Sequence, residues 1–124
     1  MGVFKVPIEV SDLQWSRVER LTAWVDTGAF YTNVPRPLLE SLGIRPHKRE
    51  RFMLADGRVG ENDIGHMWVR VGDRTEITLV LFAEPDTEPL LGAYTLEGLA
   101  LNVDPLHRKL VPMEWLPRFE VLPA

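Results

Sequence analysis

The sequence predicts an all-β fold with one or two short helices, in a single domain that spans residues 1–124. Short runs of β-branched and aromatic residues recur along the chain, as expected of strands. Ten prolines and nine glycines place turn signals between these runs. A chain of 124 residues, of which 45% are hydrophobic, can bury one core and leaves little room for a second domain.

The first half of the chain predicts three strands and a helix. Apolar residues alternate in the first segment, where Pro7 favours an edge position. The second strand begins with mixed polarity and ends in an apolar run, as if it entered the core. Pro37 suits the first turn of the helix, and Gly43 suits its C-terminal cap. The expected strands are residues 3–10, 15–25 and 32–34, and the expected helix is 35–42.

A hairpin signal organises the second half, because Asp56-Gly57 stands between two extended runs. The apolar tail has no clear period and suggests contact with a partner surface. We expect the folded core over about residues 6–112, with the tail, 113–124, at an interface. The return arm of the Asp56-Gly57 hairpin is expected to end in residues 67–71. The other expected strands are 51–54, 77–82, 90–92, 99–103 and 109–112, with a second helix at 93–98.

Composition argues against several classes of function. The formal net charge is -4, and Glu50 interrupts the most basic stretch, 47–51, so no nucleic-acid partner is expected. The absence of cysteine excludes thiolate chemistry and fits a reducing cytosol. No apolar run approaches a membrane span and no signal peptide is recognised, so we expect a cytoplasmic protein without a membrane partner. The three histidines lack ligand spacing, so no metal or cofactor is expected.

The tetrapeptide Asp26-Thr27-Gly28-Ala29 is the strongest candidate in the sequence for a catalytic segment. It follows the apolar run 21–25, so a carboxylate stands where a buried strand ends. Gly28 lets the main chain turn and approach a ligand closely. Two such carboxylates a few ångströms apart would share a proton, so that one activates water while the other protonates a carbonyl. An ordinary turn after a strand is the alternative for Asp-Thr-Gly taken alone.

The surroundings of this tetrapeptide resemble a known family. A Thr-x-Val-Pro segment and a short helix follow it, then the Asp-Gly hairpin, then Leu90-Leu91-Gly92 and a second short helix. In these features, over residues 6–112, the chain resembles the retropepsin-like aspartic proteases, specifically small single-domain prokaryotic relatives of retroviral proteases. The resemblance implies a closed β-barrel, a flap hairpin that closes over a peptide, and a homodimer.

The same resemblance implies roles for individual residues. Asp26 is the implied catalytic aspartate, within an active-site loop that continues through Thr27, Gly28 and Ala29. Thr27 would hydrogen-bond across the dimer axis, and Gly28 would contact the substrate backbone. The implied substrate-binding residues follow the loop, form the flap tip, or belong to the inner strand: Phe30, Tyr31, Ala55, Asp56, Gly57, Arg58 and Leu91.

The chain departs from the family pattern beside the tetrapeptide. Phe30-Tyr31 stands where the family usually carries a small or polar residue, and these rings could line or fill a substrate pocket. Ala93 stands where many relatives have Arg or Met. Ala29 replaces the serine of pepsin-like enzymes, so the pair loses a hydroxyl donor and a mildly acidic optimum is expected.

A single Asp-Thr-Gly requires a second copy of the chain to complete a carboxylate pair, and two-fold dimers are the commonest oligomers. The resemblance thus implies an aspartic endopeptidase that hydrolyses peptide bonds with a water activated by two Asp26 carboxylates, one from each subunit. The alternative is a catalytically weak or inactive dimeric peptide-binding module with the same fold, which the bulk of Phe30 and Tyr31 favours. A third alternative is processing of its own chain only.

Overall fold

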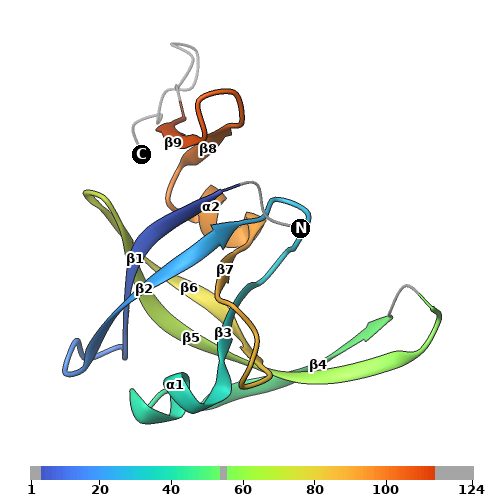
Figure 1. The fold of residues 1–124 in the computed structure, drawn as a ribbon. Helices are drawn as coiled ribbons and strands as arrows, with labels where there is room; N and C mark the ends of the chain where they lie inside the picture. The colour runs from blue at the N-terminus through green and yellow to red at the C-terminus, as the bar shows by residue number, and fades with distance from the viewer. Residues whose placement is uncertain (1–3, 54–55, 114–124) are drawn as a thin grey trace, which may run out of the picture.

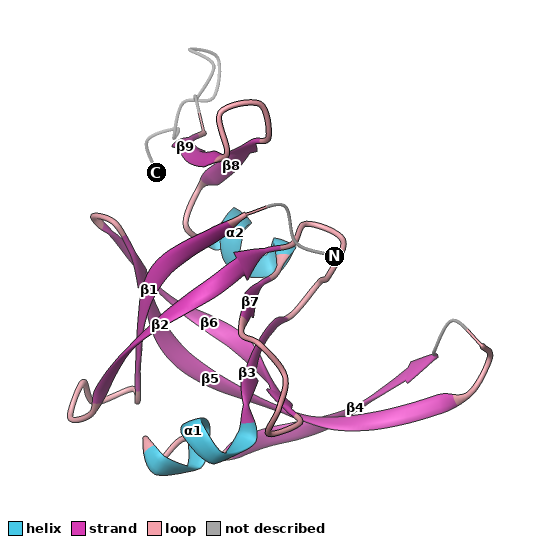
Figure 2. Cartoon of the chain, viewed as in Figure 1, coloured by secondary structure: helices cyan, strands magenta, loops and turns pink. Residues whose placement is uncertain are grey.

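The computed structural model describes residues 4–53 and 56–113, and this part of the chain is mostly β-strand (Figure 2). Two short helices, α1 (Arg36–Ser41) and α2 (Ala93–Gly98), interrupt the strands. The predicted tail lies outside the described residues, except for Met113. The strands are β1 (Lys5–Ser11), β2 (Val18–Val25), β3 (Thr32–Pro35), β4 (Pro46–Met53), β5 (Val59–Val71), β6 (Arg74–Ala83), β7 (Leu90–Leu91), β8 (Leu101–Asp104) and β9 (Lys109–Pro112).

One seven-stranded sheet has the order β1-β2-β7-β3-β6-β5-β4. Strand β1 also pairs with β5, so the hydrogen-bonded neighbours lead from β1 through β2, β7, β3, β6 and β5 back to β1 (Figure 1). Strand β4 continues the sheet outside this ring, and β8 pairs with β9 in a separate hairpin. The described residues are mostly strand with two short helices, as predicted. We call the six strands β1, β2, β7, β3, β6 and β5 the ring.

The hydrophobic core fills the inside of this ring. Side chains that alternate along the strands point inward, and both helices add to the same core through Leu39 and Leu96. Burying such side chains is the main favourable contribution to folding. The core residues with no exposed surface include Val10, Val25, Val34, Met67, Val69, Val80 and Leu91.

The predicted edge position of Pro7 has a clear counterpart in the sheet. Pro7 pairs with Thr22 of β2, whereas the pairing of β1 with β5 begins at Glu9. Among the described strands, one side of β1 therefore has no neighbour at Pro7, and a residue without an amide hydrogen is tolerated there.

Helix α1 has the proline and glycine signals that the sequence predicts, and it is one residue shorter at each end than the predicted range 35–42. Pro37 lies in its first turn, and Gly43 just beyond its end has φ of +77°, in the left-handed region that favours glycine. The Gly43 amide donates to Glu40 O over 3.0 Å, and the Ile44 amide donates to Leu39 O over 3.0 Å. These bonds satisfy carbonyls that the helix end leaves without partners.

Strands β4 and β5 continue beyond the ring as a long hairpin that extends away from the body of the molecule (Figure 1). Strand β5 pairs with β4 along residues 59–65 and with β6 along residues 64–71. The turn contains Gly57, whose φ of +87° again favours glycine. The sequence predicts this hairpin from residue 51, and the structure begins it earlier, at Pro46.

Candidate active site

Asp26 lies immediately after β2, beside strand β7. Strand β2 pairs in parallel with β7, with Trp24 opposite Leu90 and Val25 opposite Leu91. The Asp26 amide donates to Leu91 O over 3.0 Å, so the backbone of β7 holds the first residue of the loop. The Asp26 side chain is half-buried.

The tetrapeptide folds into a tight turn around the Asp26 carboxylate. Gly28 N donates to Asp26 Oδ1 over 2.9 Å, and Ala29 N donates to Asp26 O over 3.3 Å. A β-carbon at Gly28 would lie 3.2 Å from Oδ1, closer than most such contacts. The turn expected of any Asp-x-Gly is therefore present, and it also fixes the orientation of the carboxylate.

Residues 91–94 support the rest of this loop. The Ala93 amide donates to Ala29 O over 2.8 Å, and the Tyr94 amide donates to Phe30 O over 3.0 Å. A β-carbon at Gly92 would lie 2.6 Å from Tyr31 O and 2.7 Å from Phe30 O, which no real contact allows. Glycine at 92 is thus required for space, and Leu91 acts here through its backbone because its side chain is fully buried.

Three buried threonines lie beneath this support, and the sequence did not reveal them as part of the site. Thr32 of β3, Thr78 of β6 and Thr95 of α2 are 0%, 2% and 1% exposed. Gly92 N donates to Thr32 Oγ1 over 3.0 Å, and the three hydroxyls are hydrogen-bonded in series. A threonine at a position whose neighbours predict a buried apolar side chain is the sequence signal that could have identified them.

Aromatic rings extend from the loop to the β4–β5 hairpin. The Phe30 ring meets Tyr31 at a centroid distance of 5.0 Å and Tyr94 at 5.6 Å, both edge to face. Tyr31 in turn meets Phe52 of β4 at 6.1 Å. Phe30 is 57% exposed and Tyr94 40%, so this aromatic row (Phe30, Tyr31, Phe52 and Tyr94) leaves large apolar surface uncovered beside the Asp26 loop.

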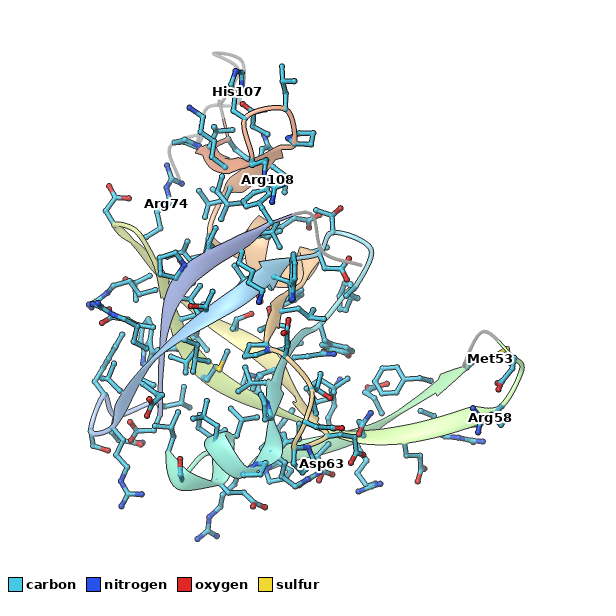
Figure 3. The ribbon with its side chains drawn as sticks, in the orientation of Figure 1. Met53, Arg58, Asp63, Arg74, His107 and Arg108 are labelled. Atoms are coloured by element: carbon cyan, nitrogen blue, oxygen red, sulfur yellow. The ribbon has the colours of Figure 1, made fainter. Side chains whose placement is uncertain are left out.

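The predicted flap residues lie at the far end of the hairpin. The Asp56 carboxylate accepts hydrogen bonds from Arg58 N over 3.0 Å and from Arg58 Nε over 2.6 Å. Met53 and Val59 form the last strand pair before the turn and are 79% and 53% exposed. Figure 3 shows Met53 and Arg58 at this tip, remote from the body. Ala55 lies outside the described residues.

The root of the hairpin is anchored by a buried carboxylate. Asp63 of β5 is 9% exposed and accepts from Arg36 of α1 over 2.8 Å and from Arg49 of β4 over 3.0 Å. Figure 3 shows Asp63 where the hairpin meets the body, and Arg36 also lies over the Phe82 ring. These contacts join α1, β4 and β5 at the point from which the hairpin projects.

A groove of about 420 Å³ includes Thr27 of the Asp26 loop among its lining residues. Thr27 lines it together with residues of α2 and the β8–β9 hairpin. Most of these are apolar, including Leu96, Leu101 and Met113, and Glu97 and Asn102 add polar groups. No residue of the aromatic row lines this groove, so the loop is next to two separate areas of apolar surface.

The histidines do not form a metal site with other ligands. The rings of His47 and His66 are adjacent, with centroids 4.8 Å apart, although the two residues are distant in the sequence. Within residues 4–53 and 56–113 there is no group of three or more His, Cys, Asp or Glu side chains arranged to hold a metal ion. Over the same residues, no helix has the length and apolar character needed to cross a bilayer.

Comparison with known proteins finds likeness in structure. No protein-family model matches the chain, and no curated protein matches it. The solution structure of simian foamy virus (mac) protease is 25% identical, with a TM-score of 0.53 over 73% of this chain and 91% of the viral one. The foamy viral protease-reverse transcriptase bound to an RNA/DNA hybrid is 18% identical, with a TM-score of 0.57 over 93% of this chain but 13% of that chain.

A bacterial structure has a similar fold. The protein Lpg0085 from Legionella pneumophila, of unknown function (DUF785), is 14% identical, with a TM-score of 0.51 over 90% of this chain and 96% of its own. The match to the foamy virus protease extends over most of both chains, so the fold is retropepsin-like. A protein with this fold and an Asp-Thr-Gly loop at the end of β2 is protease-like in architecture.

Proposed function

We propose that this protein is an aspartic endopeptidase that acts as a homodimer. The carrying observation is the position of Asp26, which begins a braced loop after β2 in a chain whose fold matches a foamy virus protease. One chain supplies one such loop, so two copies related by a two-fold axis would bring two Asp26 carboxylates together.

The chemistry follows from two carboxyl groups that share a proton. The ionised carboxylate takes a proton from a water whose oxygen attacks the peptide carbonyl carbon, while the protonated carboxyl gives its proton to the carbonyl oxygen. The carboxyl that took the water proton then gives it to the amide nitrogen as the C–N bond breaks, while the other carboxylate takes a proton from a hydroxyl of the tetrahedral intermediate. The products are a carboxylic acid and an amine, and the pair again holds one shared proton. Thr27 would brace the two loops across the axis, and Gly28 would present its backbone to the substrate. No metal or organic cofactor takes part in this scheme.

The substrate would be an extended peptide between the Asp26 loop and the flap hairpin. Strand addition lets the backbone of such a peptide pair with exposed main chain, while pockets select alternate side chains. The aromatic row exposes Phe30 and Tyr94, which favours peptides with large apolar side chains near the scissile bond. Asp56 and Arg58 form an ion pair at the flap tip, so we expect this tip to select little among peptides by the charge of their side chains.

The groove beside Thr27 and the tail 113–124 are the proposed dimer contacts. The mostly apolar lining of the groove supports burial against a second subunit, and Thr27, which belongs to that lining, is adjacent to the proposed axis. A cytoplasmic location is part of the same proposal and rests on the absence of cysteine.

The test compares wild-type protein with Asp26→Asn on an unstructured protein substrate, with Asp73→Asn as the matched control. Asp73 occupies the exposed β5–β6 turn, away from the loop. We expect wild type and Asp73→Asn to cleave equally, and Asp26→Asn to be slower by at least about a hundredfold with its melting temperature retained. Equal cleavage by all three proteins would contradict the proposal.

A non-catalytic dimeric peptide-binding module is the second candidate. The half-exposed aromatic row favours it, because rings beside Asp26 can hold a peptide without placing a carbonyl for attack. Peptide binding by wild type and Asp26→Asn with equal affinity, and no cleavage by either, would support this candidate. Cleavage of this chain alone would instead identify a self-processing protein.

A further inference from the structure

The three buried threonines beneath the Asp26 loop form one continuous hydrogen-bonded series. Thr32 Oγ1 and Thr95 Oγ1 are 2.5 Å apart, and Thr95 Oγ1 and Thr78 Oγ1 are 2.7 Å apart. Thr78 Oγ1 also lies 3.3 Å from Leu79 O. At the other end, Gly92 N donates to Thr32 Oγ1 over 3.0 Å. We name this series, from Gly92 N to Leu79 O, the threonine relay.

The two ends of the threonine relay determine the direction of every bond in it. Gly92 N can only donate, and Leu79 O can only accept. Each hydroxyl has one proton, so all three protons find an acceptor among these groups in one arrangement: Thr32 donates to Thr95, Thr95 to Thr78, and Thr78 to Leu79 O. Any reversed bond leaves a hydroxyl proton without an acceptor inside the core, which costs free energy.

The amide that begins the relay belongs to the residue against which the loop is packed. Gly92 has no space for a side chain because the backbone of Phe30 and Tyr31 lies against it. The next two amides, Ala93 N and Tyr94 N, hold Ala29 O and Phe30 O. A shift of the Gly92 peptide would therefore displace the loop that carries Asp26.

We propose that Thr95, at the centre of the threonine relay, is a positioning residue for the Asp26 loop. The inference rests on the proposed peptidase function for its catalytic consequence. The positioning of the Gly92 amide by the threonine relay does not depend on that function, because the relay is present whether or not the protein cleaves a substrate. Thr95 acts through Gly92, and it does not contact the reacting atoms.

Valine at position 95 has nearly the shape of threonine but has no hydroxyl. Thr95→Val leaves the Thr32 proton without its acceptor and Thr78 Oγ1 without its donor, and both groups are buried. The Thr32 hydroxyl would then turn to find a new partner and would loosen its hold on Gly92 N. Thr95→Ser keeps the hydroxyl and loses a methyl group, so it serves as the conservative variant.

The experiment measures peptide cleavage and backbone amide exchange in wild type, Thr95→Val, Thr95→Ser and Val10→Ala. Val10 is fully buried in β1, opposite Glu19 near the far end of the β1–β2 hairpin, and its truncation controls for lost stability. For Thr95→Val we expect kcat to fall about tenfold with KM within about threefold, since small displacements of reacting groups are costly. Thr95→Ser should recover most of kcat.

Amide exchange provides the readout that does not depend on cleavage. In Thr95→Val the amides of Gly92, Ala93 and Tyr94 should exchange faster by about tenfold, while Val10→Ala at an equal melting temperature should leave their protection unchanged. The proposal is wrong if these amides stay protected in Thr95→Val, or if Val10→Ala loses as much kcat. If wild type cleaves nothing, the peptidase proposal fails and the exchange rates alone decide on the relay.

Discussion

At residue 92 the chain has no room for a β-carbon. Replacing Gly92 with alanine would place that carbon 2.6 Å from the carbonyl carbon and oxygen of Tyr31, both of them backbone atoms that cannot swing aside. We expect Gly92→Ala to lower the free energy of unfolding by about 1–3 kcal/mol, as overpacking does in other cores. Urea unfolding followed by tryptophan fluorescence measures this change.

Gly98, six residues further along, is the matched control for this substitution. It belongs to helix α2, and no atom lies within 4 Å of the place its β-carbon would take. Alanine is a better helix former than glycine, so Gly98→Ala should be neutral or stabilising by up to about 1 kcal/mol. Equal destabilisation by both substitutions would mean that space at residue 92 is not the reason for its glycine.

The turn between β1 and β2 is organised by one carboxylate, which makes it sensitive to acid. Hydrogen bonds from the Ser16 hydroxyl and then from the Arg17 amide hold the pKa of Asp12 below its ordinary value of 3.8. The unfolded chain therefore binds a proton at Asp12 more readily than the folded chain. This contribution to stability is complete above about pH 4 and is lost as the pH falls through the lower folded value.

Asp12→Asn isolates this effect, since asparagine does not titrate. We expect the variant to be less stable than wild type at pH 6, and the difference between the two proteins to shrink as the pH falls from about 4 to 2. Unfolding midpoints in urea, measured at half-unit steps of pH, follow the difference. A stability difference between wild type and Asp12→Asn that stays constant from about pH 4 to 2 would mean that ionised Asp12 does not stabilise the fold.

The β4–β5 hairpin depends on its anchor at Asp63 more than on its ion pair at the tip. The Asp63 side chain is 12% exposed and binds two arginines, whereas the Asp56–Arg58 pair has side chains 52% and 75% exposed. We expect Asp63→Asn to cost about 1–2 kcal/mol of unfolding free energy, moderated because Arg36 and Arg49 retain access to water. Asp56→Asn should cost less than about 0.5 kcal/mol. The reverse order, measured by chemical unfolding, would overturn this view of the hairpin.

Elements with one buried face were predictable from the sequence, and those without one were not. Helix α2, which buries Thr95 and Leu96, has the predicted bounds, because apolar spacing and adjacent turn signals mark it. Strand β4 begins five residues before the predicted start. Its first half, the basic stretch 46–49, is exposed on both faces, so it carries no alternating pattern.

The predicted start of β2, at residue 15, is wrong for a different reason, since the strand begins at Val18. The predicted strand includes Trp15, but Trp15 has φ of +56° and belongs to the turn that the Asp12 side chain holds. Side-chain hydrogen bonds of this kind compete with strand pairing, and a propensity pattern does not contain them.

Within the candidate site, the sequence located the Asp26 loop, while the structure added its supports. The Asp-Thr-Gly tetrapeptide and the later Leu-Leu-Gly are local patterns, and the structure joins them through Asp26 N and Leu91 O. The threonine relay has no local pattern, because Thr32 and Thr95 meet across 63 positions of sequence. Phe52 likewise reaches Tyr31 only once β4 is folded back onto β5.

On the scale of the whole molecule, one chain supplies only half of the active site that we propose, because it has a single Asp-Thr-Gly loop. Each active site would then need two intact Asp26 residues, one from each subunit. A dimer of one wild-type chain and one Asp26→Asn chain would have a single ionisable partner and could not share a proton between carboxylates. Inactive chains should therefore inhibit active ones by exchanging subunits with them.

The expected inhibition is measured as the activity per wild-type chain in mixtures of the two proteins. When wild type is mixed with an equal amount of Asp26→Asn and the subunits exchange, a quarter of the dimers are fully wild type, so activity per wild-type chain should fall to about half. Tenfold excess of Asp26→Asn should reduce it to about a tenth by the same statistics. The control is an equal addition of Asp26→Asn without time for exchange, which should leave the initial rate unchanged. If activity per wild-type chain is indifferent to the mutant at every ratio after full exchange, each chain works alone, and the two carboxylates of the mechanism would have to come from one subunit.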